Sequence, residues 1–335
     1  MKKHVSIKEI AKIAKCSIST VSNVLNGNSR FFSEDTRSRV LKAVSDNHYV
    51  SNSSGRNLRT GKTETVGVVF YPPNADVFGS EFYINVMRGL QKVLSENGYE
   101  MLLSEYTRQF SENALPPTFI SRGKVDAVIV LGGFPQRAAD AILGGGIPAL
   151  VLDSFNPLAD SILTNGRKAT KEAVKYLASK GHKHIEYFLY GNDDYNSAMR
   201  AKGFLDGVKD CGLDKSLCAV HNNLRDNFGA EREFEEMMNL GKRPTAVMGV
   251  NDSLSTFLME RARSHGLEIP KDMAFFGFDD VALARRSSPA LSTIHVDTLA
   301  LGELGARTVL ERIKNPEAPL IKKVFTPTAV YRAST

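Results

Sequence analysis

Residues 6–26 read SIKEIAKIAKCSISTVSNVLN, and this stretch predicts two short helices joined by a tight turn. Ser6 and Glu9 match the S-x-x-E capping box, which satisfies free backbone amides at a helix start. Apolar residues then recur at helical spacing: Ile7, Ile10, Ala11 and Ala14. Two such helices form a helix-turn-helix, a motif that places its second helix in the major groove of DNA.

The second of these helices begins with small polar residues. Ser17 can cap its start, and Gly27 suits its end because glycine reaches the left-handed conformation at little steric cost. The polar side chains of its first turns are Ser17, Ser19, Thr20, Ser22 and Asn23. They suit a surface that approaches bases and phosphates, but a helix pair this short can equally be plain packing.

The charge distribution favours DNA binding over plain packing. Residues 1–62 contain 12 Lys and Arg against 4 Asp and Glu, whereas the remainder contains 31 against 33. The whole positive excess of the chain, +6 in total, therefore belongs to the N-terminal segment. This is the electrostatic pattern of a module that binds phosphates.

Length and composition indicate an ordinary globular protein of two or three domains. The chain has 335 residues, of which 42% are hydrophobic and 24% charged. It has no apolar run of about 18 residues and no secretory signal, so we expect a cytoplasmic protein. Its three cysteines, Cys16, Cys211 and Cys218, fit no common zinc pattern and are expected to be cytosolic thiols.

A third helix and a polar linker are expected next. Ser33 can cap a helix over 33–47, with Val40, Leu41 and Val44 closing a three-helix core. Residues 48–65, HYVSNSSGRNLRTGKTET, have the composition of a flexible linker. Leu58 is a lone large apolar residue in this polar, basic segment.

From residue 65 onward, strands alternate with helices. The expected strands cover 66–70, 99–104, 125–131, 149–152, 184–190, 219–221, 246–250, 273–276 and 323–331. The expected helices cover 82–97, 138–143, 168–180, 199–211, 230–240 and 253–265. This alternation predicts parallel sheets with right-handed crossovers, arranged as two similar α/β lobes. In open α/β sheets ligands bind at the carboxyl ends of the strands, so a cleft is expected there.

Polar residues at these strand ends suggest a small-molecule site. They are Asp153, Asn251, Asp252 and Asp279, with Arg200 near the start of a helix. The set suits a hydroxylated or anionic small molecule. The alternative is that they are helix caps and turn formers, since Asp and Asn are good caps wherever they occur.

No catalytic motif competes with this interpretation. The sequence contains no G-x-S-x-G, no P-loop and no H-E-x-x-H, and its histidines are scattered. Asp193-Asp194 and Asp279-Asp280 are lone acidic pairs without clustered metal ligands. We therefore expect no catalytic residue, no metal and no cofactor: the chain is not expected to be an enzyme.

The chain resembles the lactose-repressor/galactose-repressor (LacI/GalR) family of bacterial transcription regulators along its whole length. In the N-terminal part the matching pieces are VSIKEIAKIAKCSISTVSNVLNG, Thr36-Arg37, VLKAV, Tyr49 and Leu58. In the body they are MRGL (87–90), Gly98-Tyr99, GIP (146–148), Asp153, Lys180-Gly181-His182, Arg200, Gly203-Phe204, Asn251-Asp252, GFDD (277–280) and LSTI (291–294). The resemblance implies an all-α helix-turn-helix headpiece and a periplasmic-binding-protein-like body of two Rossmann-like lobes.

For the headpiece, the resemblance implies specific DNA contacts. Ile18, Ser19 and Asn23 are expected to read bases. Ile18 would pack on a thymine methyl group, Ser19 would hydrogen-bond to either base type, and Asn23 would pair with adenine. Phosphate contacts, which set register, are expected from Ser17, Thr20, Ser22, Asn26 and Tyr49. In the family the linker folds into a short helix on DNA, and a leucine at the place of Leu58 wedges into the minor groove.

For the body, the resemblance implies an effector cleft that takes a sugar or sugar derivative. The ligand-facing residues would be Phe82, Tyr83, Asp153, Arg200, Asn251 and Asp279. This chain departs from the family pattern at Asn165-Gly166, where Asp-Asn is frequent, and at Leu224, where some sugar-binding relatives have an aromatic residue. The rival classes are a sugar-transport protein, which would need a secretory signal, and an enzyme, which would need a nucleophile or an acid–base pair.

These observations predict an effector-controlled repressor that binds a near-palindromic operator as a homodimer. The expected divisions are a DNA-binding domain over 1–50, a hinge over 51–64 and an effector-binding and dimerisation domain over 65–335. The sequence carries no leucine-heptad tail of the kind that some relatives use to tetramerise, so a dimer is expected.

The linker provides the first prediction. Gly55 occupies a hinge position that is commonly alanine in the family, and glycine costs about 1 kcal/mol of helix stability relative to alanine. Gly55→Ala should therefore tighten operator binding, measured by fluorescence titration. Unchanged or weaker affinity would contradict a helical hinge.

Overall fold

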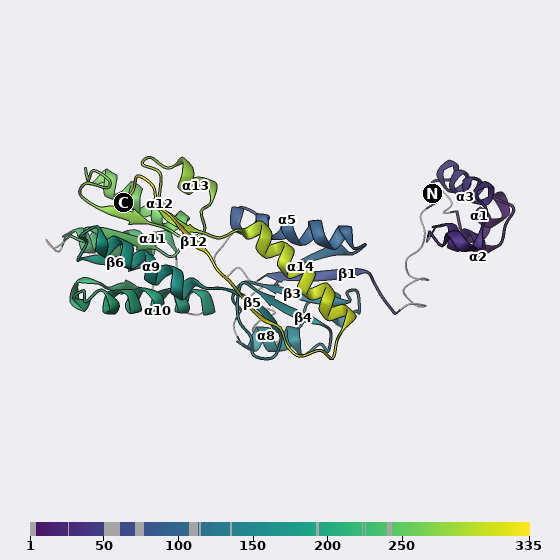
Figure 1. Cartoon of the computed structure of the whole chain (residues 1–335), viewed down its shortest axis with the longest axis horizontal. Coiled ribbons are helices and arrows are strands. Elements are labelled where there is room, and N and C mark those ends of the chain that lie inside the picture. Colours follow the sequence, from purple (N-terminus) through teal and green to yellow (C-terminus); the bar gives the residue numbers. More distant parts are fainter. Residues whose placement is uncertain are drawn as a thin grey trace. The chain divides into compact units, whose positions relative to one another are not determined.

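The structure is a computed structural model that describes residues 5–25, 27–49, 61–70, 77–106, 113, 115–134, 136–191, 194–222, 224, 226–239 and 243–335. The chain forms two compact units, Met1–Thr63 and Glu64–Thr335 (Figure 1). None of the described helices combines the length and the apolar character needed to cross a bilayer.

The first unit contains three helices and a short 3-10 turn. They are α1 (Ile7–Ile13), α2 (Ile18–Leu25), η1 (Ser29–Phe31) and α3 (Glu34–Asp46). The predicted capping box is confirmed, because the Glu9 amide donates to Ser6 Oγ at 3.3 Å and the Ser6 amide donates to Glu9 Oε2 at 2.7 Å. Lys15 has a positive φ of 51°, which makes the tight turn between α1 and α2.

The core of this unit is small and differs from the prediction at one residue. It consists of Ile10, Ala11, Ala14, Val21, Val24, Val40 and Ala43. Leu41 was expected in the core but is 42% exposed. The reason is helical geometry: Val40 and Ala43, three residues apart, share the inner face of α3, and Leu41 lies about 100° around the helix from Val40.

The second unit begins with an N-terminal lobe built on a six-stranded parallel sheet in the order β11-β5-β4-β3-β1-β2. Its strands are β1 (Thr65–Phe70), β2 (Glu100–Glu105), β3 (Ala127–Leu131), β4 (Ala149–Leu152), β5 (Asp160–Thr164) and β11 (Lys322–Phe325). Its helices are α5 (Glu81–Glu96), α7 (Thr118–Ser121), α8 (Gln136–Leu143) and α14 (Thr298–Lys314).

Two helices distant in the sequence, α5 and α14, pack side by side in this lobe (Figure 1). Their backbones touch at glycines. A Cβ atom at Gly89 would lie 2.2 Å from Leu299 O, and one at Gly302 would lie 2.1 Å from Val86 O. Larger residues there would force the helices apart.

The C-terminal lobe contains a four-stranded parallel sheet in the order β7-β6-β8-β9. Its strands are β6 (Ile185–Phe188), β7 (Val220–His221), β8 (Ala246–Gly249) and β9 (Ala274–Phe276). Its helices are α9 (Gly166–Ser179), α10 (Tyr195–Asp210), α11 (Asn227–Asn239), α12 (Asp252–Ser264) and α13 (Ala282–Arg286).

Three segments connect the lobes. The chain enters the C-terminal lobe between β5 and α9, returns between β10 (Thr293–His295) and α14, and crosses again between β11 and β12 (Thr328–Val330). Strands β10 and β12 pair in an antiparallel ribbon. The last crossing brings Ser334 into the C-terminal lobe, where its carbonyl accepts a hydrogen bond from the Phe275 amide.

The alternation of strands and helices in the body is confirmed, with two corrections. The expected strand over 323–331 is two strands, β11 and β12, interrupted at Thr326-Pro327 because proline has no amide hydrogen to donate to a ladder. Strands β5 and β10 and helices α7, α13 and α14 were not predicted. The start of β5 is polar, but Asp160 is fully buried by an ion pair with Arg312 of α14.

This buried pair provides a stability prediction. Arg312 donates from Nε and Nη2 to the two carboxylate oxygens of Asp160, both at 2.8 Å. Arg312→Met would leave the Asp160 charge buried without its partner, which costs about 3–5 kcal/mol. Urea unfolding measures the loss.

Arg307→Met is the matched control, since Arg307 pairs with Glu303 on the surface of the same helix. An exposed pair of this kind contributes about 0–1 kcal/mol. Equal effects of the two substitutions would contradict a special role for the buried pair.

Candidate ligand cleft and nucleic-acid interface

Helix α2 presents hydroxyl groups at its start. Ser17 Oγ accepts the Thr20 amide at 3.0 Å and lies 2.7 Å from Ser19 Oγ. Ser17, Ile18 and Ser19 are exposed, whereas Thr20, Ser22 and Asn23 are half-buried. Val21 and Val24 bury the opposite face in the core. The predicted DNA-facing residues that lie on α2 therefore share its outer side and first turns.

Three predicted contacts lie elsewhere. Tyr49 is half-buried against the core of the first unit, and its amide donates to Val44 O at 3.0 Å. The remaining two, Asn26 and Leu58, lie outside the described residues, as does Gly55.

The structure also brings two side chains to α2 that sequence reasoning missed. The backbone amide of Asn28 donates a hydrogen bond to Asn23 O at 2.9 Å and so ties the following turn to the C-terminal end of α2. The following turn, η1, contains Arg30 and Phe31, both exposed, and Phe31 is 68% exposed. A basic and an aromatic side chain next to α2 enlarge the candidate interface.

In the body, three aspartates have a left-handed backbone, with φ of 57° at Asp153, 107° at Asp279 and 60° at Asp280. Asp153 directly follows β4, and the other two follow β9. L-residues rarely adopt this conformation, and such strain concentrates at functional sites. Two of these strained residues, Asp153 and Asp279, were predicted to face a ligand.

Asp153 is held by both lobes. Thr164 Oγ1 of the N-terminal lobe donates to Oδ1 at 2.6 Å, and Asn196 Nδ2 of α10 donates to Oδ2 at 3.0 Å and to the Asp153 carbonyl at 2.7 Å. Burial raises the pKa of Asp153 to about 6, although these hydrogen bonds oppose the shift. Sequence reasoning missed Asn196 because it expected the helix to begin at Met199, four residues later than α10 does.

Arg200 is the central cation of the C-terminal lobe. Its Nη1 donates to Val250 O at 2.6 Å, its Nη2 lies 3.7 Å from Asp279 Oδ1, and its guanidinium carbon lies 3.6 Å from the centroid of the Phe278 ring. Its Nε is buried without a hydrogen-bond partner. A buried donor without a partner is costly, which makes the position of Arg200 a candidate functional one.

Phe82 and Tyr83 project from the first turn of α5, with ring centroids 5.3 Å apart in an edge-to-face arrangement. Burial raises the pKa of the Tyr83 hydroxyl, and so do three carboxylate charges around it. These belong to Asp153, Asp194 and Asp279. Carboxylates of both lobes therefore contribute to the raised pKa of Tyr83, a residue of the N-terminal lobe.

Asn251 and Asp252 have the structural roles that the sequence left open as the alternative, those of a helix cap and a turn former. Asn251 Oδ1 accepts the Leu254 amide at 2.9 Å and so caps α12. Asp252 is fully buried and accepts the Val281 amide at 2.9 Å. Its role is structural, because it ties α12 to the turn after β9.

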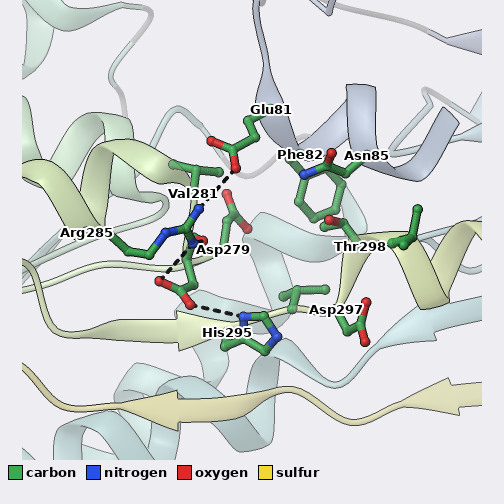
Figure 2. Close-up of a pocket in the computed structure, with 12 residues that line it drawn as sticks. Glu81, Phe82, Asn85, Asp279, Val281, Arg285, His295, Asp297 and Thr298 are labelled. Atoms are coloured by element: carbon green, nitrogen blue, oxygen red, sulfur yellow. Dashed lines mark hydrogen bonds and ion pairs between the residues drawn. The ribbon is translucent and has the colours of Figure 1, made fainter. Parts of the chain in front are cut away.

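A cavity of about 190 Å³ lies where α5, the turn after β9 and the β10–α14 connection meet. Figure 2 shows Phe82 and Asp279 on its border. Glu81 closes one side by accepting the Ala282 amide at 2.6 Å and approaching Arg285 Nη2 at 3.3 Å. Among the described residues, no three His, Cys, Asp or Glu side chains are arranged to hold a metal ion.

Comparison with known proteins identifies the family. Residues 6–52 match the model of bacterial regulatory proteins of the lacI family, and residues 174–335 match a periplasmic binding protein-like domain. The ribose operon repressor of Haemophilus influenzae is 30% identical over 332 residues, covering 98% of both chains. The chain belongs to the lacI family. As a member of this family it is a DNA-binding transcriptional regulator and not an enzyme.

Other similarities agree with this assignment. The HTH-type transcriptional repressor PurR of Vibrio campbellii is 29% identical to this lacI-family chain, over 96% of it and 95% of that protein. The fold matches the Lac repressor dimer bound to operator and the anti-inducer ONPF, with a TM-score of 0.87, 21% identity and 99% coverage of both chains. A regulator from Enterococcus faecium with bound ribose matches with a TM-score of 0.70, 23% identity and coverage of 81% of this chain and 98% of that one.

The contact between the lobes provides a prediction for this lacI-family body. A Cβ atom at Gly133, after β3, would lie 2.4 Å from Asp194 Cβ in the other lobe. Gly133→Ala should therefore lower the free energy of unfolding by about 1–3 kcal/mol through overpacking. Gly229→Ala in α11, where a Cβ meets nothing closer than 3.6 Å, should be neutral or slightly stabilising. Wild-type stability of Gly133→Ala in urea unfolding would mean that the two lobes do not meet here in solution.

Proposed function

We propose that this chain is a repressor whose affinity for its operator is controlled by a small polyhydroxylated effector, a sugar or sugar derivative, held between the two lobes of the body. The observation that carries the proposal is the match to the ribose operon repressor, which extends through head and body over 98% of both chains. One protein therefore combines a DNA-facing helix with a ligand cleft.

The proposed domains keep the boundaries expected from the sequence. Residues 1–50 bind DNA, residues 51–64 form a hinge, and residues 65–335 bind the effector and dimerise. The proposed DNA contacts are Ser17, Ile18, Ser19, Thr20, Ser22, Asn23, Asn26, Tyr49 and Leu58. The proposed effector contacts are Phe82, Tyr83, Asp153, Arg200, Asn251 and Asp279, to which we add Asn196.

The cleft chemistry supports a ligand rich in hydroxyl groups. Carboxylate oxygens of Asp153 and Asp279 accept hydrogen bonds, and the Arg200 Nε is a free buried donor. An aromatic ring such as that of Phe82 can cover the apolar face of a sugar. Two solved structures of this fold hold ribose and cellobiose, respectively.

Control of DNA binding requires that the effector prefers one arrangement of the lobes. Three segments connect the lobes, and the hydrogen bonds from Asn196 to Asp153 join them in the described arrangement. An effector that binds between the lobes changes the balance between arrangements. The coupling is reciprocal, so operator DNA must change effector affinity by the same factor.

We expect a homodimer from features of both the DNA-binding unit and the body. Two heads related by a two-fold axis can read the halves of a near-palindromic operator. In the body, β2 is an edge strand of the N-terminal lobe, and Leu102 and Leu103 on it are each 37% exposed. An apolar edge strand of this kind is suited to pairing with a second copy. Sedimentation should therefore give twice the mass of one chain.

The DNA-binding part of the proposal is tested by titrating double-stranded fragments from upstream of the coding region with full-length protein at several salt concentrations. We expect tight binding to one fragment that weakens steeply with salt, because phosphate contacts release counterions. Ser19→Ala and Asn23→Ala should each weaken binding to that fragment by about 1–3 kcal/mol through lost base contacts.

Ser38→Ala, an exposed serine on α3, is the control and should bind as the wild type does. Equal affinity for all fragments with unaffected variants would refute sequence-specific recognition by α2. Adding D-ribose or cellobiose to the same titration tests whether a sugar changes operator affinity, in either direction.

A further inference from the structure

We propose that Glu186, His221 and Glu233 form a proton-dependent clamp, which holds helix α11 against the edge of the C-terminal sheet and releases it as pH rises. The clamp joins three elements, because Glu186 lies on β6, His221 ends β7 and Glu233 lies on α11. It shares no residue with the proposed effector contacts, so it stands independently of the proposed function.

Both ring nitrogens of His221 face carboxylate oxygens. Nδ1 lies 2.6 Å from Glu233 Oε2, and Nε2 lies 3.1 Å from Glu186 Oε2. A neutral imidazole has one donor and one acceptor, so it satisfies only one of two carboxylates, whereas the imidazolium donates from both nitrogens. Both contacts can therefore be made at once only while the trio holds an additional proton.

The additional proton belongs to the ring and not to a carboxylate. Glu186 also accepts hydrogen bonds from His184 Nε2 at 2.8 Å and from the Ala219 amide at 3.1 Å. Burial favours the protonated form of Glu186, but the hydrogen bonds from the two histidines outweigh it and lower its pKa. For His221, burial opposes the charge, but the hydrogen bonds to Glu186 and Glu233 outweigh it and raise the pKa.

This two-sided arrangement distinguishes His221 from the other described histidines. Those that form a ring hydrogen bond through a single nitrogen are His182, His184, His265 and His295. His265 is the closest parallel, because its Nε2 lies 2.8 Å from Glu235 Oε1 on the same helix α11. A neutral ring keeps such a one-sided contact by carrying its hydrogen on that nitrogen. Only the His221 contacts therefore require a charged ring.

Loss of the proton breaks the contact with Glu233. The Glu186 side chain is 8% exposed and held by further donors, so the hydrogen that remains on the ring stays on Nε2. The bare Nδ1 then presents a lone pair to the Glu233 carboxylate, which is repulsive. Glu233 is 26% exposed, so its side chain can turn to water.

The clamp acts at a weakly held edge of the lobe. Strand β7 has two residues and is the edge strand of its sheet, where it pairs with β6. The His221 ring stacks on Phe188 with centroids 4.2 Å apart, and a charged ring is attracted more strongly to an aromatic face than a neutral one. Helix α11 also buries three apolar side chains: Ala230, Phe234 and Met237. Release of Glu233 therefore loosens the β7 side of α11 while its apolar face keeps it on the lobe.

Other titratable groups near the clamp do not replace it. The thiol of Cys218, which precedes β7, is buried, and burial raises its pKa, so it stays neutral through neutral pH. The ion pairs on the opposite flank of α11 join it to α12: Glu231 with Arg261, and Glu235 with His265. They do not contact β7.

The clamp is next to the edge of the sheet where ligands of parallel α/β proteins bind. The connection from β7 to α11 leaves the sheet at the carboxyl end of β7. Tyr190, just after β6, donates its hydroxyl to Asn227, the first residue of α11. A shift of α11 would therefore reach this edge.

The direction of the pH effect follows from the raised pKa of His221. Such a group stabilises the fold fully below its unfolded value, about 6.5, and the contribution is lost as pH rises through the folded value. Glu186 has a lowered pKa, so its contribution is present above its ordinary range and is lost only in acid. The clamp is therefore closed at about pH 6 and open at about pH 8.5.

Hydrogen–deuterium exchange of the full-length protein at pH 6.0 and 8.5 tests the clamp. The quantity compared is the protection factor of α11 amides, which removes the intrinsic effect of pH on exchange. We expect α11 of the wild type to lose about tenfold in protection between the two conditions, as expected for the loss of a hydrogen bond between charged groups.

Glu233→Gln tests the cause of this loss. A glutamine amide can donate to a bare Nδ1 or accept from a protonated one, so the variant should keep the tether and lose its pH dependence. Asp153, with a pKa of about 6, and Asp252, with a pKa of about 7, also titrate in this range. They are unchanged in the variant, so the comparison with the wild type cancels their effects. Glu235→Gln is the matched control and should retain the wild-type loss.

NMR titration of the histidine Cε1–H signals of the wild type gives a second measurement. The His221 signal is identified by its absence from the spectrum of His221→Gln. We expect its midpoint to lie above pH 6.5, the ordinary value, and to move to lower pH in Glu233→Gln.

Several outcomes would overturn the clamp. They are a wild-type midpoint at or below pH 6.5, equal protection of α11 at both pH values, a loss that persists in Glu233→Gln, and a loss abolished equally in Glu235→Gln. Thermal unfolding verifies that each variant is folded. The exchange measurement on the wild type needs no variant, so the proposal can fail even if a substitution prevents folding.

Discussion

The hydrogen bonds between Asn196 and Asp153 are the interaction on which the organisation of the body depends. One side-chain amide in the C-terminal lobe reaches both the carbonyl and the carboxylate of a residue in the N-terminal lobe. It can do so because the backbone of Asp153 is left-handed. The atoms that join the lobes are thus also atoms of the proposed ligand contacts.

Two buried aspartates of the body, Asp160 and Asp279, differ in how closely a cation compensates their charge. Asp160 is fully buried, and both its oxygens accept from Arg312. Asp279 is largely buried, yet its nearest cation is 3.7 Å away. Burying an incompletely compensated carboxylate is costly, and burial raises its pKa. A buried carboxylate with a strongly shifted pKa and no close cation is a candidate functional residue, and in this respect Asp279 differs from Asp160.

The N-terminal unit differs from the body in its small core and its concentrated positive charge. Its core contains only seven buried apolar residues, and its basic charge is concentrated in a short segment. Attraction to phosphates is long-ranged and independent of sequence, whereas the small side chains of α2 act at contact distance. On the proposed DNA contacts, affinity and specificity would come from different atoms of one small unit.

Much of this protein follows from local sequence pattern. The helix-turn-helix, its caps at Ser6 and Ser33, and the alternation of strands and helices depend on residues close in the chain. Spacing and capping chemistry are sufficient to predict such features. The strand-end positions of Asp153 and Asp279 were predicted for the same reason, because parallel strands end at a common edge.

What the sequence could not determine depends on contacts between distant residues. Asn196 and Thr164 carry no motif, and only the folded chain brings them to Asp153. Strand β5 was not predicted, and the burial of Asp160 at its start depends on Arg312, 152 residues away in the chain. Sequence by itself determined the fold class, the helix-turn-helix and the family. The tertiary structure alone decided which buried acids have a close cationic partner, as Asp160 has in Arg312, and which do not, because compensation of charge depends on distance in space and not on order in the chain.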